Sequence, residues 1–324
     1  MALQTNSDTL ITIFGGSGFL GRHVVRALAK RRYRIRVAVR RPELAGFLQP
    51  LGTVGQITAV QANLRYPRSV EAAVRDADIV INLVGILFER GRQNFEAVQH
   101  FGAEQVALAA TASGARVIHV SAIGADEKSS SLYAQSKAKG EQAVRAASPD
   151  AMIVRPSIVF GPEDEFFNRF ASMARMLPFL PLIGGGETKF QPVFVGDIAE
   201  AIATAVEKHE GFGTTYEFGG PEVKTFRELM EFVLATTERK RLLLPVPFGL
   251  AKLKASFLQY LPNPLLTPDQ VELLRHDNVV SARAIHENRT LSAFGIVPAA
   301  YEAIVPNYLW RFRKTGQFRT GRFA

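Results

Sequence analysis

The sequence contains no cysteine among its 324 residues. Disulfide bonds, thiol catalysis and cysteine-ligated zinc or iron–sulfur centres are therefore excluded. The six histidines are scattered and do not form an H-E-x-x-H or comparable metal-binding spacing. We expect no metal site.

Long apolar runs are also missing. The longest, residues 79–88, is about half as long as a membrane-spanning helix. The first ten residues, MALQTNSDTL, lack the basic segment and apolar run of a signal peptide. We expect neither secretion nor a membrane-spanning segment.

The composition is that of an ordinary folded protein, with 47% hydrophobic and 21% charged residues. The length allows one large domain or a two-lobed unit. Acidic residues are fewer than basic ones, 30 against 39, and the net charge is +9. Such an excess favours anionic partners such as phosphate cofactors, acidic proteins, lipid headgroups or nucleic acid.

The first half of the chain alternates short β-branched runs with amphipathic segments. The runs are LITIFG, RIRVAVR, GQITAVQAN, DIVINLVG, RVIHVSAIG and AMIVRPSIVFG. Their length and composition predict buried parallel strands joined by crossover helices. We therefore predict an α/β, Rossmann-type doubly wound parallel sheet in residues 8–160, completed by parts of 190–220.

After Gly161 the pattern loosens into segments rich in proline and glycine. We predict a smaller C-terminal α/β lobe made of residues 161–189 and 221–305, followed by a basic aromatic tail, 306–324. Asp197 is predicted to cap one helix, and Thr225 with Glu228 to open another through a capping box.

A glycine-rich loop lies directly between the first strand and the first helix. Glycines there let the backbone turn tightly and approach a pyrophosphate, while the helix N-terminus supplies N–H donors. The alternative is a glycine-rich turn without a ligand. We predict dinucleotide binding by the loop residues Gly15, Ser17, Gly18, Phe19, Leu20 and Gly21.

The second strand ends in Arg40 and Arg41, where a carboxylate would bind the adenosine ribose of NAD. Two arginines would instead attract a 2′-phosphate, which favours NADPH or NADP+. The alternative is a solvated turn. The rest of the predicted cofactor path lies at later strand ends, at Asn63, Leu83, Val84, Gly85 and Pro156.

A set of catalytic type follows the fifth strand. Ser121 lies at the strand end, and Tyr133 and Lys137 are four residues apart on one face of a predicted helix. A lysine lowers the pKa of such a tyrosine and binds the nicotinamide ribose. The tyrosine exchanges a proton with the substrate oxygen, and the serine hydrogen-bonds that oxygen. We predict that all three residues also contact the cofactor.

These motifs in this order resemble the short-chain dehydrogenase/reductase superfamily, in the branch that includes sugar-nucleotide epimerases. Over residues 8–235 the motifs are GGSGFLG, VSAIGA, YAQSK, RPSIVFGPED, PVFVGDIAEAI and YEFGGPEVKTFREL. Extended enzymes of this superfamily carry an asparagine where this chain has Gln99 and His100, a departure that affects the proton relay.

Residues 153–171, IVRPSIVFGPEDEFFNRFA, and the ending YLWRFRKTGQF are similar to a narrower family, the NADPH-binding accessory subunits of respiratory complex I. That resemblance implies that the bound nucleotide has a structural role. It also implies that the protein is a peripheral subunit near the junction of the hydrophilic arm with the membrane. Mitochondrial members lack an intact Tyr/Lys pair, whereas this chain keeps Tyr133 and Lys137.

The tail interleaves aromatic and basic residues: Trp310, Arg311, Phe312, Arg313, Lys314, Phe318, Arg319, Arg322 and Phe323. Aromatic residues with arginine are typical of interface anchors, so we predict docking on an acidic partner. The alternatives are a solvated end and nucleic-acid binding.

A second amphipathic segment has apolar residues at helical spacing: Leu250, Leu253, Phe257, Leu258 and Leu261. It predicts either a helix on its own core or a basic helix at a membrane surface, in contact with lipid headgroups.

We interpret the protein as an NADP(H)-binding accessory subunit of complex I, peripheral to the cytoplasmic face of a bacterial inner membrane, or to the matrix side if mitochondrial. It would stabilise the complex without turning over substrate. The rival hypothesis is a soluble NADPH-dependent reductase or epimerase using Ser121, Tyr133 and Lys137. A nucleotide-sensing regulator is third.

Overall fold

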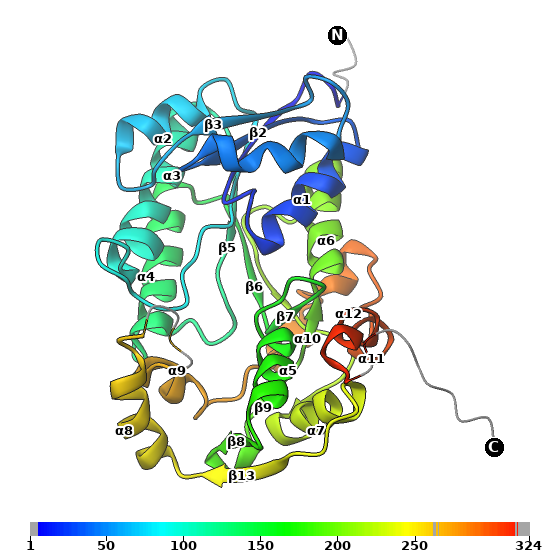
Figure 1. The fold of residues 1–324 in the computed structure, drawn as a ribbon. Coiled ribbons are helices and arrows are strands. Elements are labelled where there is room, and N and C mark those ends of the chain that lie inside the picture. The colour runs from blue at the N-terminus through cyan, green and yellow to red at the C-terminus, as the bar shows by residue number, and fades with distance from the viewer. Residues whose placement is uncertain (1–5, 262–263, 265, 315, 317–324) are drawn as a thin grey trace, which may run out of the picture. The chain divides into compact units, whose positions relative to one another are not determined.

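The computed structural model describes residues 6–261, 264, 266–314 and 316 (Figure 1). The chain separates into two compact units, each described by itself. Unit 1 consists of Met1–Pro156, Val195–Phe218 and Ser281–Ile296. Unit 2 consists of Ser157–Phe194, Gly219–Val280 and Val297–Ala324.

Unit 1 is built on a 7-stranded sheet in the order β11-β6-β5-β4-β1-β2-β3. All neighbouring strands are parallel. Its strands are β1 (Leu10–Phe14), β2 (Arg34–Val39), β3 (Ile57–Gln61), β4 (Ile79–Asn82), β5 (Arg116–Val120), β6 (Met152–Pro156) and β11 (Thr215–Phe218). The predicted doubly wound α/β sheet is confirmed.

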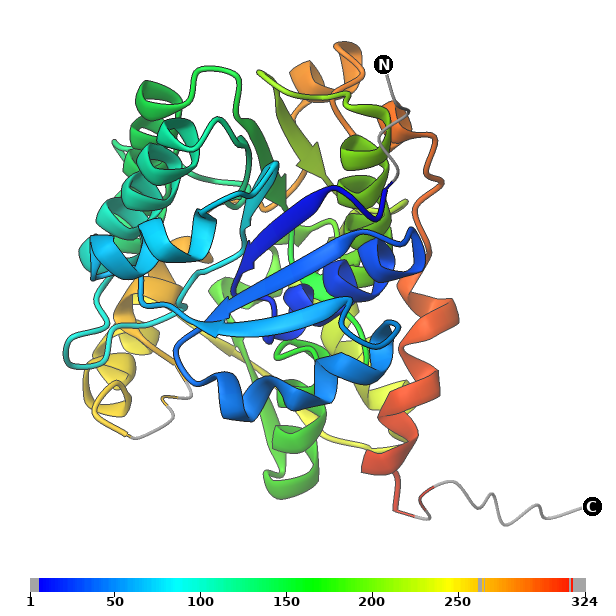
Figure 2. The same ribbon diagram turned by 90° about the horizontal axis from the view of Figure 1, so that it is seen from above.

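Helices cover both faces of this sheet, which explains why its central strands β1, β4 and β5 are buried along almost their whole length. Figure 1 shows α2, α3 and α4 on one side of the strands and α1 and α6 on the other. The blue strands β1, β2 and β3 lie side by side in Figure 2. The helical elements of unit 1 are α1 (Phe19–Lys30), η1 (Pro42–Leu51), α2 (Pro67–Val74), η2 (Glu96–His100), α3 (Phe101–Ala112), α4 (Leu132–Ala147), α6 (Val195–Lys208), α10 (Ala282–His286) and η4 (Leu291–Phe294).

Unit 2 is made of small two-stranded sheets and short helices around an aromatic core. The core includes Phe160, Phe167, Phe226, Tyr301 and Tyr308. The elements are β7 (Val159–Phe160), α5 (Phe167–Met176), β8 (Phe179–Ile183), η3 (Gly184–Gly186), β9 (Lys189–Phe190), β10 (Val193–Phe194), β12 (Lys224–Thr225), α7 (Phe226–Thr236), β13 (Leu242–Val246), α8 (Phe248–Leu258), α9 (Pro268–Leu273), α11 (Tyr301–Ile304), α12 (Pro306–Leu309) and η5 (Trp310–Phe312).

The helix starts follow local capping chemistry. The Thr225 capping box with Glu228 is present at the start of α7, as predicted. The prediction for Asp197 was wrong, because α6 already begins at Val195 and Asp197 lies in its first turn.

The first part of the basic aromatic segment is folded against unit 2. Tyr308 and Leu309 are buried, and the Tyr308 hydroxyl donates to the Asp164 carboxylate. Phe312 packs on the same aromatic core. The Arg313 guanidinium donates to the Thr236 carbonyl at 2.9 Å. Phe318, Arg319, Arg322 and Phe323 lie outside the described residues.

Within the described part of the chain, no helix is both long enough and apolar enough to cross a membrane.

Candidate nucleotide-binding site

The glycine loop between β1 and α1 is packed so tightly that its geometry requires glycine. Gly15 has φ +78°, a backbone region in which other residues are strained. An added Cβ at Gly21 would lie 2.2 Å from the Gly15 carbonyl oxygen. The Gly18 N–H donates to that same carbonyl at 3.0 Å, closing the turn.

The N-terminus of α1 has no side-chain cap from its N-cap residue. Gly18 is the N-cap residue and has no side chain, and the first turn contains no acidic residue. Phe19 and Leu20 open the helix, and Ser17 precedes it in the half-buried turn. A helix start of this kind leaves N–H groups and a partial positive charge for an anion such as a pyrophosphate.

The loop after β4 adjoins the glycine loop. An added Cβ at Gly15 would lie 3.2 Å from Val84 Cγ2 and 3.3 Å from the Leu83 carbonyl carbon. Asn82, the last residue of β4, holds this loop, because its Oδ1 accepts the Val84 N–H at 3.1 Å. The loops after β1 and β4 meet where the strand order reverses, which is where doubly wound sheets bind ligands.

The same loop leads to the predicted catalytic set. An added Cβ at Gly85 would lie 3.2 Å from Lys137 Nζ. The structure therefore places a row of neighbouring residues between the glycine loop and the predicted catalytic set: Gly15, Val84, Gly85 and Lys137. A dinucleotide needs such a continuous path from its pyrophosphate to its nicotinamide end.

Arg40 and Arg41 follow β2 and are both exposed. They stand at the carboxyl end of the sheet, the same end as the glycine loop. Asn63 follows β3, and its Oδ1 accepts the Arg65 N–H at 3.2 Å. Pro156 is buried at the end of β6, and its carbonyl accepts the Ile123 N–H at 3.0 Å.

Lys137 is carried by α4, which Ser131 caps by accepting the Ala134 N–H at 3.2 Å. The lysine is buried at 5% exposure, and its Nζ donates to the Val120 carbonyl at 3.3 Å. Burial lowers the pKa of Lys137 to about 8, while the Glu141 carboxylate one turn later raises it. A buried ammonium group of this kind can bind ribose hydroxyls and titrate near neutral pH.

Tyr133 lies one turn before Lys137, with Lys137 Nζ 5.9 Å from the centre of its ring. Phe95 packs edge-on against the same ring, with 5.9 Å between ring centres. Ser121 follows β5 and is buried, and its Oγ has no hydrogen-bond partner among the described residues. A buried hydroxyl without a protein partner is suited to hydrogen-bond an oxygen atom of a substrate or cofactor.

The two residues in place of the family asparagine have different positions. Gln99 is buried within the π-helical turn η2, and its Nε2 donates to the Ile86 carbonyl at 3.2 Å. Its backbone carbonyl lies against α4, 2.1 Å from where a Cβ on Gly140 would be. His100 points outward to Glu96. Only Gln99 can therefore take the inward position.

The sequence reasoning missed His119 on β5. Its side chain is buried, and Nδ1 lies 3.3 Å from Asn82 Nδ2. Within the part of the chain that the structure describes, Nε2 has no hydrogen-bond partner. Burial and the Lys137 charge lower the pKa of His119 to about 3, so the imidazole is neutral near pH 7. A histidine inside an otherwise β-branched run, RVIHV, was the available signal.

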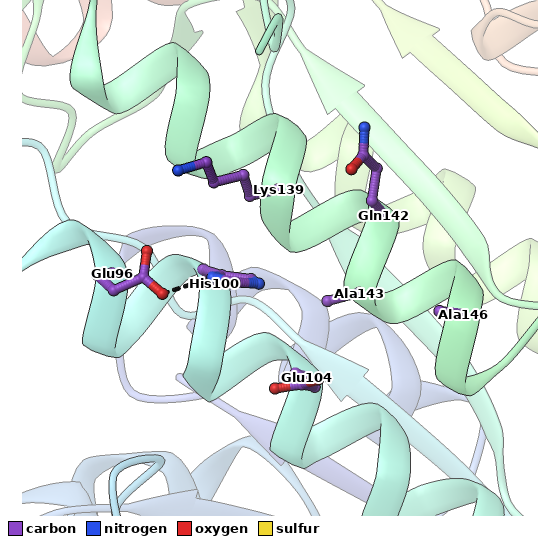
Figure 3. Close-up of a pocket in the computed structure, with 7 residues that line it drawn as sticks. All are labelled: Glu96, His100, Glu104, Lys139, Gln142, Ala143 and Ala146. Carbon is purple, nitrogen blue, oxygen red and sulfur yellow. Dashed lines mark hydrogen bonds and ion pairs between the residues drawn. The ribbon is translucent and has the colours of Figure 1, made fainter.

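An open groove of ≈ 460 Å³ lies elsewhere, between η2, α3 and α4. Figure 3 shows Glu96 and His100 joined by the 2.6 Å contact between Oε1 and Nδ1, with Lys139 and Gln142 on the α4 side. The groove is lined by Glu96, His100, Glu104, Lys139, Gln142, Ala143 and Ala146. It includes none of the predicted cofactor residues.

The fold and the glycine loop define a class of nucleotide-binding protein. The chain belongs to the NAD dependent epimerase/dehydratase family, whose sequence profile matches residues 11–219. It has the same fold as the NAD-bound dTDP-glucose 4,6-dehydratase of Streptomyces venezuelae, with a TM-score of 0.70, 19% identity, and coverage of 96% of this chain and 99% of that one.

Among individual relatives, the chain is 36% identical to the mitochondrial NADH dehydrogenase [ubiquinone] 1 alpha subcomplex subunit 9 of Arabidopsis thaliana. That match covers 96% of this chain and 79% of the relative. The chain is also 40% identical to the ceramide reductase of Caulobacter vibrioides over 181 residues, which is 56% of each protein.

Proposed function

We propose that the protein is an NADP(H)-binding accessory subunit of respiratory complex I. The observation that carries this proposal is the similarity to the alpha subcomplex subunit 9 relative, which extends over nearly the whole chain. The nucleotide stabilises the subunit, and Ser121, Tyr133 and Lys137 hold its nicotinamide end.

The subunit is peripheral, on the cytoplasmic face of a bacterial inner membrane or the matrix side of a mitochondrial one. It docks beside the hydrophilic arm near the membrane junction, where it contacts lipid headgroups. Residues from Trp310 onward contribute to docking. Because Arg311 and Arg313 are already bonded to Asn168 and Thr236, we assign the exposed side of Trp310 and the residues after Lys314 to the partner.

The decisive experiment is a native-mass measurement on detergent-solubilised membranes. We expect the protein to migrate with NADH:quinone oxidoreductase activity in a very large complex. Migration near its own mass of 35.6 kDa would overturn the proposal.

We propose that Arg40 and Arg41 select NADP(H). A charge-assisted contact to a phosphate contributes about 1.5–3 kcal/mol, so Arg40→Ala with Arg41→Ala should weaken NADPH binding roughly tenfold to hundredfold. NADH binding should change little. Arg34→Ala, at the opposite end of β2, is the matched control. Nucleotide extracted from the native protein identifies the ligand directly, and NAD would contradict the assignment.

A second candidate function is a ketone reductase. It is favoured by the buried Lys137 with its lowered pKa, by the orphaned Ser121 hydroxyl, and by the similarity to the ceramide reductase. In that case Lys137 would bind the nicotinamide ribose, Tyr133 would deliver a proton to the carbonyl oxygen, and Ser121 would hold that oxygen. A reduced nicotinamide bound there would supply the hydride.

Variants of Tyr133 and Lys137 separate the two functions. NADPH consumption with a panel of small ketones and keto-lipids, abolished by Tyr133→Phe, supports the reductase. Under the subunit proposal, Tyr133→Phe leaves respiratory NADH:quinone activity nearly unchanged, while Lys137→Ala lowers nucleotide retention.

A further inference from the structure

Helix α8 of unit 2 presents most of its large apolar side chains to solvent and its small ones to the interior, while Phe248 and Leu258 are half-buried. The buried residues of α8 are Ala251 and Ala255. On the other side Leu253 is 59% exposed and Phe257 is 73% exposed. A helix that packs on its own core has the reverse arrangement, with its leucines and phenylalanines inside. The interpretation of this stripe as a core-packing face is therefore wrong.

The exposed apolar surface continues on both sides of the helix. Before it, β13 exposes Leu242 and Leu244 while pairing with β8 in a two-stranded sheet. Figure 1 shows β13 running directly into α8. After the helix, Tyr260 is 84% exposed and Leu261 is also exposed. We call this surface the β13–α8 face, made of Leu242, Leu244, Leu250, Leu253, Phe257, Tyr260 and Leu261.

The segment that carries this face has only positive charges. No aspartate or glutamate lies between Glu238 and Asp269, whereas five basic residues do: Arg239, Lys240, Arg241, Lys252 and Lys254. Arg239 and Arg241 donate to the backbone carbonyls of Phe312 and Ala174, so those contacts leave their charges uncompensated. Lys252 does pair with Glu272 of α9, at 2.8 Å.

The composition distinguishes between a protein and a lipid partner. Cores of protein–protein interfaces are depleted in lysine. Leucine and phenylalanine interleaved with lysine are instead typical of helices that lie in a membrane interface, where lysine extends its ammonium group to the headgroups. With 11 residues, α8 is about 16 Å long and can only lie in the membrane plane.

We propose that the β13–α8 face binds the surface of a bilayer containing anionic lipid. Leu253 and Phe257 enter the boundary between headgroups and acyl chains. Tyr260 lies at headgroup level, where tyrosine is enriched in membrane proteins, and Lys254 with Lys240 faces the lipid phosphates. This contact needs no partner subunit, so its test is independent of assembly into complex I.

The test is flotation of the purified full chain with vesicles of phosphatidylcholine alone or with about 30% phosphatidylglycerol. We expect binding to the anionic vesicles that weakens as salt rises from about 0.05 to 0.5 M. Leu253→Ser with Phe257→Ser should lower the partition coefficient about tenfold or more. Lys240→Gln with Lys254→Gln should lower it several-fold and reduce its salt dependence.

Leu44→Ser is the matched control, because Leu44 is 62% exposed in unit 1 and lies outside the face. It should bind vesicles like the native protein. All variants should keep the native melting temperature, since the changed side chains are exposed.

Depth of insertion is accessible because the chain has no cysteine. A Tyr260→Cys variant labelled with an environment-sensitive fluorophore should shift to the blue on anionic vesicles, and a labelled Leu44→Cys variant should not.

Three results would overturn the proposal. One is absence of vesicle binding, and another is binding that the Leu253→Ser/Phe257→Ser variant retains in full. The third is a native dimer, seen by light scattering, that this variant converts to a monomer, because a second copy would then cover the face.

Discussion

Helices α4 and α8 both distribute their side chains against the usual rule, but in opposite directions. α4 buries polar and charged residues, including Lys137 and Glu141, against the sheet of unit 1. α8 buries alanines and exposes leucine and phenylalanine on unit 2. The buried Glu141 pairs with Arg155. We ascribe the inward ammonium group of Lys137 to the proposed nucleotide site, and the outward apolar residues of α8 to the proposed lipid surface. On this interpretation, departures from the binary pattern mark the surfaces where each unit meets a partner.

The largest effect is expected on α4, from Glu141→Ala. The Glu141 carboxylate is buried and accepts two hydrogen bonds from Arg155, at 2.8 and 2.6 Å. Removing one member of a buried pair costs roughly 3–5 kcal/mol, and we expect the lower end because Glu217 lies 3.8 Å from the same arginine. Urea denaturation measures the loss. The double change Glu141→Met with Arg155→Met should recover much of it. A single variant within about 1 kcal/mol of the native protein would contradict this account.

The next largest effect is a gain in the free energy of unfolding, expected from Lys137→Met in the nucleotide-free protein. Folding lowers the pKa of Lys137 from 10.5 to about 8, which corresponds to about 3 kcal/mol of destabilisation below pH 8. Between pH 8 and 10.5 the unfolded chain binds more protons, so native stability rises with pH in this window. Lys137→Met should therefore stabilise the protein by about 2–3 kcal/mol at pH 7 and hardly at all above pH 10.5.

Denaturation curves at pH 7 and pH 10.5 test this prediction. Lys139→Met, at an exposed position of the same helix, should show no such pH-dependent gain. If Lys137→Met destabilises the nucleotide-free protein at pH 7, the ammonium group is held by its surroundings and is not strained by burial.

On α8 we expect a smaller loss from Ala255→Leu. Ala255 is fully buried, and adding a larger side chain there should cost about 1–3 kcal/mol through overpacking. Thermal unfolding measures the loss. A neutral result would mean that α8 is loosely attached to unit 2.

The smallest effect is expected from Leu253→Ala on the same helix. This change removes apolar atoms that are already in water, so stability should change by less than about 0.5 kcal/mol. A destabilisation as large as that of Ala255→Leu would show that Leu253 is packed in the free protein.

The sheet could be predicted from sequence because each strand is a short β-branched run bounded by turn residues. The glycine loop could also be predicted, since the spacing of Gly15, Gly18 and Gly21 between a strand and a helix is typical of a tight strand–helix turn. In α4 the Tyr133 and Lys137 spacing placed both residues on one face.

Two features could not be predicted from the sequence, for physical reasons. The residues around Gln99 form a π-helical turn, which changes the angle between successive side chains, so the helical period could not tell whether Gln99 or His100 faces inward. In α8 the period showed that Leu250, Leu253 and Phe257 share a face. It could not show which face of α8 is buried. In the structure the buried face is that of Ala251 and Ala255.

The order in which the two units appear along the chain has a consequence for biosynthesis. The chain passes from one unit to the other after Pro156, Phe194, Phe218, Val280 and Ile296. Strand β11, which pairs with β6, is therefore made only after the first segment of unit 2. Until the ribosome has delivered it, β6 is an open sheet edge, which is a template for aggregation. We expect chains interrupted between Pro156 and Thr215 to need chaperones and to be degraded rather than accumulate as half-molecules.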